Sequence, residues 1–154
     1  MKLRNSSVVV RQLDNKMAGF TSLDNEMVSG GSWIRTIRTA LNMSLRQLGS
    51  RLAITPQSVR DMERRELEGT LSLKTLRETA NALDMKLVYG FIPKDGSLEK
   101  MIDRKAHDIA AKIVGRTSVT MNLEGQGNSE ERLKAAIEEL AYEIKTQMPK
   151  QLWD

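Results

Sequence analysis

The sequence predicts a mainly α-helical fold with one short β-strand. Apolar residues recur at spacings of three and four along most of the chain, which is the period of an amphipathic helix. Helix-capping residues precede several of these segments. One stretch near the middle, residues 86–92, instead alternates like a strand, and Pro93 ends it. Together these three observations favour a helical protein in which the strand is the exception.

The clearest pattern lies at residues 44–63, where two short helices are joined by a tight turn. Ser44 is expected to cap the first helix, and Gln47 completes a capping box. Thr55 is expected to cap the second helix, whose first position suits Pro56. Apolar residues on one side predict a common core, namely Leu45, Leu48, Leu52, Ile54, Val59 and Met62. Basic and amide residues remain on the other side, so the stretch is predicted to be a helix-turn-helix.

Residues 33–84 resemble the lambda-repressor-like (XRE) helix-turn-helix family. The resemblance adds a helix before the motif, at residues 33–41, and one after it, at residues 73–83. Two residues depart from the family pattern. Gly49 stands where the family usually has Ala, and still permits close helix contact. Ala53 stands where the family often has Gly, and is strained if its φ is positive.

Composition excludes several classes of protein. The 154 residues include no cysteine, which excludes disulfides, thiol catalysis and cysteine-ligated zinc. No apolar run approaches the ~20 residues of a membrane span, and no signal-peptide core is visible, so we expect a cytoplasmic protein. Because no nucleophile–base pair, metal cluster or phosphate-binding glycine loop is visible, we expect no enzyme, catalytic residue, metal or cofactor.

The positive charge of the chain is concentrated on the predicted helix-turn-helix. The whole chain has a net charge of +4. Residues 33–65 hold seven arginines and two acidic residues, a net charge of +5. Residues 97–154 hold nine basic and ten acidic residues, a net charge of −1. Because arginine suits phosphate groups and guanine edges, this distribution favours a nucleic-acid partner.

The family resemblance implies how the motif contacts double-stranded operator DNA. The N-terminus of its second helix is expected to enter the major groove. Gln57 is the expected base reader, because its amide can pair with adenine. The other outward positions on that helix are Ser58, Arg60, Asp61 and Arg64. Asp61 either accepts from cytosine or orients a neighbouring arginine. Residues expected to contact phosphates are Ser44, Arg46 and Thr55.

We predict three parts: an N-terminal helical arm and linker at residues 1–31, the DNA-binding domain at residues 32–94, and a C-terminal helical region at residues 95–154. The arm is expected to be helical at residues 4–20 and to pack on the body or on a second copy. The strand at residues 86–92 is expected to pair across a two-fold axis or with an N-terminal segment. An extended buried segment is the alternative.

Two helices are expected in the C-terminal region. The first is long and is predicted to fray or break at Gly115 and the Ser/Thr cluster at residues 117–120. The second is predicted to begin at Ser129 and to stop at Pro149.

The segment between these two helices contains Thr120-x-x-x-Glu124-Gly125. It matches the short motif Ser/Thr-x-x-x-Glu-Gly/Asn of antitoxins that inhibit Fic proteins. On a helix, Thr120 and Glu124 would share a face. The same residues would also fit an ordinary polar turn that leads into the last helix.

The order of these features, from the XRE-type motif through VYGFIP and a long helix to TMNLEGQ and a closing helix, resembles the bacterial mobile mystery protein A family. Its members are usually encoded beside a Fic-domain protein, which transfers AMP from ATP to hydroxyl groups of target proteins. The resemblance implies an antitoxin that inhibits such an adenylyltransferase and represses its own operon, and we expect it to bind operator DNA as a homodimer.

The resemblance also implies roles for the motif residues. Glu124 would pair with an arginine that otherwise holds the ATP γ-phosphate, while Thr120 hydrogen-bonds nearby and Gly125 permits close approach. The alternative is a stand-alone XRE-family repressor whose C-terminal helices only dimerise or sense a ligand.

Overall fold

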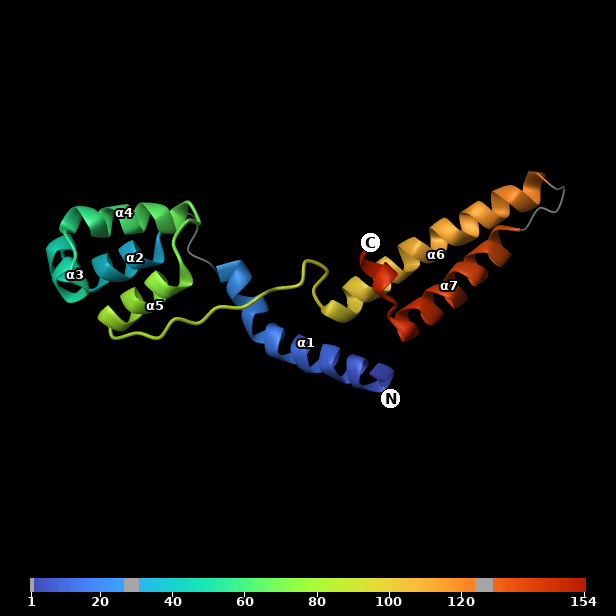
Figure 1. Cartoon of the computed structure of the whole chain (residues 1–154), viewed down its shortest axis with the longest axis horizontal. Coiled ribbons are helices and arrows are strands. Elements are labelled where there is room, and N and C mark those ends of the chain that lie inside the picture. Colours follow the sequence, from blue (N-terminus) through green and yellow to red (C-terminus); the bar gives the residue numbers. More distant parts are fainter. Residues whose placement is uncertain (1, 27–30, 124–128) are drawn as a thin grey trace. The chain divides into compact units, whose positions relative to one another are not determined.

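The computed structural model describes residues 2–26, 31–123 and 129–154. These residues form seven α-helices and one short 3₁₀-helix, labelled in chain order in Figure 1. The chain divides into two compact units. One is Glu26–Tyr89, and the other combines Met1–Asn25 with Gly90–Asp154. The domain boundaries expected from the sequence, at residues 31/32 and 94/95, stay a prediction.

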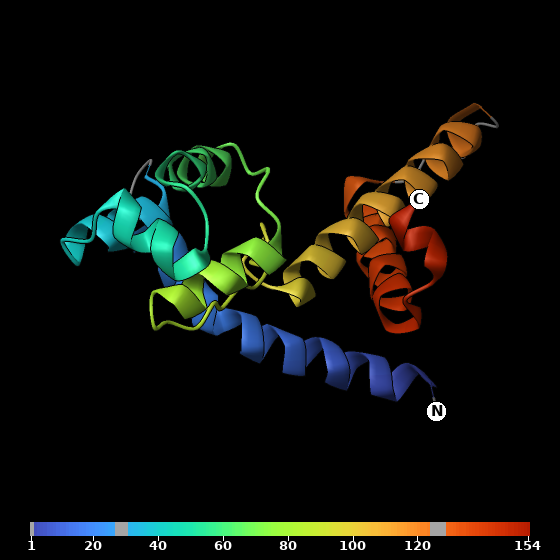
Figure 2. The same ribbon diagram turned by 60° about the vertical axis from the view of Figure 1, so that its left-hand side comes forward.

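The unit Glu26–Tyr89 is a bundle of four helices, which Figures 1 and 2 show gathered around a common centre. They are α2 (Trp33–Ala40), α3 (Leu45–Leu52), α4 (Pro56–Leu67) and α5 (Leu73–Ala82). A hydroxyl side chain caps each helix by accepting from the amide three residues later; the caps are Ser32, Ser44, Thr55 and Ser72. The predicted capping box of Ser44 and Gln47 is present. The expected helix-turn-helix is therefore confirmed.

The core of this unit comes from the apolar side of each helix. Its buried residues are Ile34, Leu48, Val59, Met62 and Leu83. Leu48 and Val59 are fully buried, at 0% exposure, and they come from the two helices of the motif. Burial of these side chains fixes α4 against α3 through the hydrophobic effect.

The turn between α3 and α4 brings the two backbones close together. A Cβ atom on Gly49 would lie 2.7 Å from the carbonyl oxygen of Ile54, so only glycine fits without a shift. This confirms the expected close contact at Gly49. Ala53 ends α3 with φ at 56°, in the left-handed region, so the expected strain at this alanine is present.

The strand predicted at residues 86–92 is wrong. After Leu83 and a turn residue, the chain runs without regular structure to Pro93, and the described residues contain no strand. A strand needs a neighbour that completes its hydrogen-bond ladder, and the described residues offer none. The alternative of a buried extended segment does not describe it either. Val88, Tyr89 and Phe91 are 66%, 57% and 77% exposed.

The other unit consists of α1 (Lys2–Glu26), α6 (Leu98–Leu123), α7 (Glu130–Gln147) and the 3₁₀-helix η1 (Lys150–Trp153). Figure 1 shows α6 and α7 side by side, as a helical hairpin. Their buried residues form one core with η1, made of Ile102, Ala106, Ala110, Ala141, Ile144 and Leu152. Ser129 caps α7 as expected, and Pro149 follows the end of this helix.

Long-range contacts of Val10, Asp14 and Phe20 attach α1 to the rest of its unit. The carboxylate of Asp14 accepts from the amides of Leu98 and Glu99, at 2.7 and 3.2 Å, and so caps α6. The ring of Phe20 lies against Gly90, where an added Cβ would meet it at 2.6 Å.

The break predicted at Gly115 and residues 117–120 is wrong, because α6 continues to Leu123. The hydroxyls of Thr117 and Thr120 donate to the carbonyl oxygens one turn earlier, at 3.1 Å each. This pairing lets both residues remain in a helix. A single glycine costs only about 1 kcal/mol relative to alanine in a helix, which the rest of α6 outweighs.

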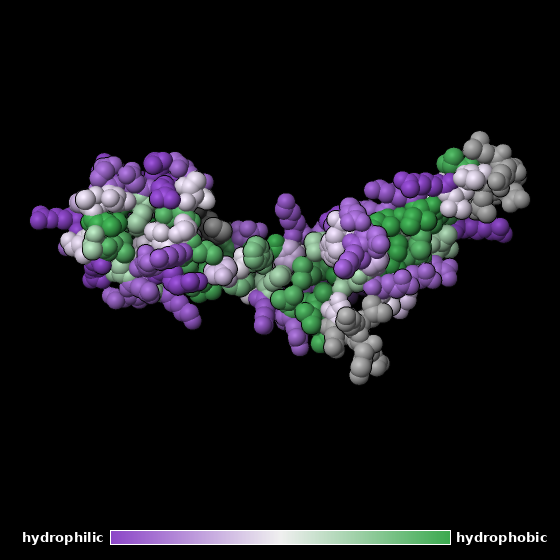
Figure 3. Space-filling model, viewed as in Figure 1, coloured by the Kyte–Doolittle hydropathy of each residue, from purple (hydrophilic) through white to green (hydrophobic). Residues whose placement is uncertain are grey.

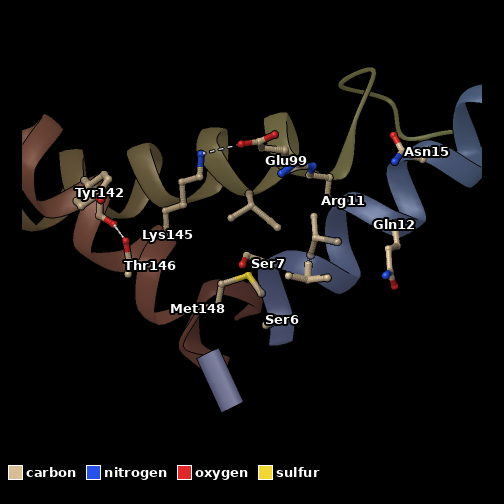
Figure 4. A pocket seen from close by; sticks show the side chains of 13 residues that line it. Ser6, Ser7, Arg11, Gln12, Asn15, Glu99, Tyr142, Lys145, Thr146 and Met148 are labelled. Atoms are coloured by element: carbon tan, nitrogen blue, oxygen red, sulfur yellow. Dashed lines mark hydrogen bonds and ion pairs between the residues drawn. The ribbon is translucent and has the colours of Figure 1, made fainter. Parts of the chain in front are cut away.

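A cavity of about 760 Å³ lies between α1, α6 and α7. Figure 4 shows Lys145 on one wall, where its ammonium group donates to Glu99, and Arg11 on the side of α1. Val10 and Ile102 supply apolar lining. None of the described helices is long and apolar enough to cross a membrane.

Candidate nucleic-acid interface

The second helix of the motif, α4, has two opposite faces of different character. Four predicted DNA-contacting residues recur at helical spacing and are all exposed: Gln57, Arg60, Asp61 and Arg64. Half a turn away, four residues face the interior of the unit, namely Val59, Met62, Glu63 and Glu66. The helix therefore presents a polar face while its other face is fixed to the bundle.

Glu63 anchors α4 through a buried ion pair. Its Oε1 lies 2.7 Å from Nε of Arg38 on α2, and the two side chains are only 9% and 11% exposed. The same guanidinium donates to the carbonyl oxygen of Met43 at 2.9 Å. A buried pair with this many hydrogen bonds fixes geometry, since loss of one partner leaves an uncompensated charge.

Glu66 anchors the next turn of α4 to the beginning of α2. Its carboxylate accepts from the backbone amides of Trp33 and Ile34, at 3.0 and 3.1 Å, and from the hydroxyl of Ser32. These amides lie at the positive end of the α2 dipole, where a carboxylate is favoured. Together with Glu63, this contact sets the orientation of α4 relative to α2.

The three hydroxyl residues predicted at the interface lie at helix beginnings. Ser44 and Thr55 are exposed and accept from the amides of Gln47 and Ser58, at 3.2 and 3.1 Å. The hydroxyl oxygens of Thr55 and Ser58 are 2.8 Å apart. A capping hydroxyl keeps its own proton to donate, so Ser44 remains suited to a phosphate oxygen.

The structure separates the arginines that are engaged within the unit from those that are not. Arg38 is paired with Glu63, and Arg51 donates to the carbonyl oxygen of Ala82 and lies 3.4 Å from Asp84. Among the described residues, no carboxylate lies within ion-pair distance of Arg35, Arg46 or Arg60.

On α4 itself, Arg60 and Arg64 therefore differ. Arg64 lies 2.7 Å from Glu68 and 4.0 Å from Asp61, so two carboxylates already flank it. This places Asp61 beside a neighbouring arginine, and both roles expected for Asp61 stay predictions. Arg60 has its whole charge available to a phosphate or a base.

Arg46 lies in a shallow hollow that sequence reasoning did not describe. The hollow has a volume of about 390 Å³, and its polar lining residues besides Arg46 are Asn42, Gln47, Ser50 and Arg51. Gln47 was assigned only a capping role, and Ser50 none. Ser50 lies four residues after Arg46 on the same helical face, and this spacing was the signal that could have identified it.

The second predicted site is only partly within the described residues. Thr120 lies in the last turn of α6, is exposed, and donates to the carbonyl oxygen of Arg116 at 3.1 Å. Glu124 and Gly125 lie outside the described residues. Across the described ranges, no group of three or more acidic, histidine or cysteine side chains is placed to hold a metal ion.

Residues 34–89 match a family model described as helix-turn-helix. The match lies inside the unit Glu26–Tyr89 and ends at its last residue. It supports the XRE family expected from the sequence, whose domains bind double-stranded DNA and are not catalytic. Comparisons of the chain with curated proteins and with solved structures gave no match.

Proposed function

We propose that this chain, whose residues 34–89 are an XRE-type helix-turn-helix domain, is a transcriptional repressor that reads its operator with α4. The observation that carries the proposal is the division of α4 into an exposed polar face and an opposite face fixed by Glu63 and Glu66. A helix held in this way can enter the major groove without first being ordered, which lowers the entropic cost of binding.

In this proposal each residue of the exposed face has a distinct role. Gln57, in the first turn of α4, pairs with adenine and reads sequence. Arg60 contributes a charge that no carboxylate of the described residues pairs, while Ser44, Arg46 and Thr55 bind phosphates and set register. Two copies bind two half-sites, which in helix-turn-helix proteins lie about 34–36 Å apart.

Selection of binding sequences from a random duplex library tests the reading role of Gln57. We expect the wild type to enrich a two-fold symmetric sequence and Gln57→Ala to lose preference at one base pair of each half-site. Loss of a bidentate contact reduces discrimination by about 1–3 kcal/mol at that position. Gln147→Ala, an exposed glutamine at the end of α7, is the matched control. Unchanged preference in Gln57→Ala would contradict the assignment.

We also propose that the region after Thr120 inhibits a Fic-domain adenylyltransferase, which supplies the antitoxin part of the function. Two observations support it: the spacing Thr120-x-x-x-Glu124-Gly125, and the exposure of Thr120 in the last turn of α6. Such a partner transfers AMP from ATP to a protein hydroxyl and releases pyrophosphate. A carboxylate from Glu124 on the arginine that holds the γ-phosphate would keep ATP in an unreactive position.

Co-expression with a Fic-domain protein encoded beside this chain tests the second proposal. We expect wild type to abolish AMP transfer and Glu124→Gln to restore it while the two proteins still co-purify. Glu131→Gln, in the first turn of α7, is the matched control and should inhibit like the wild type. If Glu124→Gln inhibits fully, Glu124 is not the inhibitory residue. If the wild type does not inhibit either, the chain is instead a stand-alone repressor whose C-terminal helices dimerise or sense a ligand.

A further inference from the structure

The cavity between α1, α6 and α7 has no part in the proposed function. Its volume of about 760 Å³ lies in the range of about 300–1,000 Å³ that is typical of small-molecule sites. All of its lining residues belong to one unit of the chain, the one that combines Met1–Asn25 with Gly90–Asp154. The cavity is therefore large enough for an organic molecule and is formed within a single unit.

The cavity is open because small side chains lie where α1 approaches the hairpin of α6 and α7. Val10 packs against the core of the unit, and Asp14 caps α6 about one turn further along α1. Ser7 lies on the same side of the helix, three residues before Val10, and Ser6 precedes it. Two serines in succession supply little side-chain volume, so space remains between this part of α1 and Met148 of the opposite wall.

Part of the wall is apolar. Val10, Ile102 and Met148 line the cavity, and Ile102 also belongs to the core of the unit. Val8 and Tyr142 line it as well, and they are 54% and 71% exposed. Figure 3 shows hydrophobic residues both on α1 and on the hairpin. A ligand with an apolar body would remove these side chains from water, which favours its binding.

The charged part of the wall favours an anion. Three charged residues line the cavity, Arg11, Lys145 and Glu99, and Figure 4 shows Glu99 between the other two. Lys145 lies 3.3 Å from Glu99 and 2.7 Å from Asp103, so two carboxylates already balance its charge. Within the described ranges, no carboxylate lies within ion-pair distance of Arg11. Its guanidinium is therefore available for two parallel hydrogen bonds to a carboxylate.

We propose that this cavity binds a small organic carboxylate, whose apolar body lies against Val10, Ile102 and Met148 and whose carboxylate pairs with Arg11. The ligand class follows from the lining, since apolar walls with a few polar groups fix the orientation of a molecule that is polar at one end. A neutral ligand would leave Arg11 without a partner, and a cationic ligand would be repelled by it. This inference goes beyond the proposed function and depends neither on DNA nor on a Fic-domain partner.

Two dyes with the same apolar body test the charge requirement in the full chain. One is 1-anilinonaphthalene-8-sulfonate, an anion, and the other is N-phenyl-1-naphthylamine, which lacks the sulfonate. Both fluoresce more strongly in apolar surroundings. We expect Arg11→Met to weaken binding of the anionic dye about tenfold, because a hydrogen bond between charged groups is lost, and to leave binding of the neutral dye unchanged. Arg132→Met, exposed on α7 and outside the cavity lining, is the matched control and should bind both dyes like the wild type.

Displacement of the anionic dye tests the ligand class. Decanoate has an apolar chain and a carboxylate, and decylammonium has a chain of the same length with the opposite charge. We expect decanoate to displace the dye and decylammonium to leave it bound. Thr146→Phe tests the location, since Thr146 is exposed and lines the cavity. The added ring would occupy part of the cavity, so this variant should bind both dyes more weakly.

Four results would overturn the proposal. The first is the absence of saturable binding of the anionic dye to the wild type. The second is a loss of affinity in Arg11→Met that is the same for both dyes, or that Arg132→Met shares. The third is displacement by decylammonium as effective as displacement by decanoate, and the fourth is unchanged binding of both dyes to Thr146→Phe. All titrations are made without DNA and without a partner protein, so failure of the proposed function leaves them unaffected.

Discussion

The two units of the chain use charged side chains differently. In the unit Glu26–Tyr89, Glu63 and Glu66 lie on the inner face of α4 and bind partners on or before α2. In the other unit the ion pairs lie at the surface, and Lys145 with Glu99 and Asp103 is an example. The unit Glu26–Tyr89 is therefore fixed by buried polar contacts between its helices, whereas the unit that contains α6 and α7 is held by an apolar core.

Each unit carries its own fluorescent probe, which allows the comparison to be tested one unit at a time. The chain has two tryptophans. Trp33 begins α2, and Trp153 ends η1. A Trp153→Phe variant keeps Trp33 as its fluorescent probe, so it reports unfolding of the unit Glu26–Tyr89. A Trp33→Phe variant keeps Trp153 and reports unfolding of the other unit. The substitutions below are made in these two backgrounds.

The largest effect is expected for Glu63→Ala. It leaves the Arg38 guanidinium buried without its carboxylate, and loss of one partner of a buried pair typically costs about 3–5 kcal/mol. The free energy of urea unfolding reported by Trp33 should fall by that amount, whereas the value reported by Trp153 should not change. Glu68→Ala, which removes the exposed partner of Arg64, is the control and should cost less than about 1 kcal/mol. Similar losses of stability in Glu63→Ala and Glu68→Ala would contradict the role of Glu63 as an internal anchor of α4.

Glu66→Ala should have the next largest effect. It removes the carboxylate that accepts from the amides of Trp33 and Ile34, and loss of a helix cap costs about 0.5–2 kcal/mol. We expect the free energy of urea unfolding reported by Trp33 to fall by this amount. A shift seen by Trp153 instead would show that the two units do not unfold separately.

Asp14→Ala tests the corresponding contact in the other unit. The carboxylate caps α6 from α1, so its loss should destabilise that unit by about 1 kcal/mol. The Trp153 transition in urea measures the change. Asp24→Ala, an exposed aspartate on the same helix, should leave the transition unchanged. Equal effects of the two substitutions would mean that Asp14 contributes no specific cap.

Ala53→Gly should stabilise the unit Glu26–Tyr89 slightly. Its φ of 56° costs an alanine about 1 kcal/mol, which glycine avoids. The gain is reduced by the greater freedom of glycine in the unfolded chain, so we expect less than about 1 kcal/mol in thermal or urea unfolding. Asn42→Gly is the matched control, since asparagine already tolerates its φ of 52°. A loss of stability in Ala53→Gly would contradict the claim that the backbone of Ala53 is strained.

The smallest effects concern pH and the hairpin unit. A hydrogen bond from Arg104 lowers the pKa of Asp95 from its usual 3.8, so this stabilisation is present above pH 3.8 and is lost as pH falls further. A hydrogen bond to Asp103 raises the pKa of Lys145 above its usual 10.5, so its contribution is lost as pH rises beyond that value. Lys145→Met should reduce the loss of stability at alkaline pH, measured by unfolding that Trp153 fluorescence reports. An unchanged alkaline profile would contradict the assignment.

Local signals predicted most of the helix-turn-helix unit. Ser44 with Gln47, and Thr55 with Pro56, lie within one helical turn of the structure they specify, and all four act as expected. The strand at residues 86–92 was wrong because alternation describes one segment and cannot show whether a neighbouring edge exists. The break at Gly115 was wrong because hydroxyls such as that of Thr117 find acceptors within the helix itself.

The two anchors of α4 were also missed, although the sequence contains a sign of them. Glu63 and Glu66 recur with Val59 and Met62 at the spacing of the buried face, where acidic residues need partners. Their partners are 25 and more residues away, so spacing alone could not identify Arg38 or the beginning of α2. Long-range polar contacts of this kind require the tertiary structure.

The central claim is that the exposed face of α4 lies on DNA, and the salt dependence of operator affinity tests it most directly. We predict that Arg60→Ala lowers the slope of log affinity against log salt concentration by about 1, the value for one phosphate contact. Arg64→Ala should lower it less, because Glu68 and Asp61 already flank this arginine. Arg132→Ala, exposed on α7, should leave the slope unchanged. An unchanged slope in both α4 variants would contradict the claim.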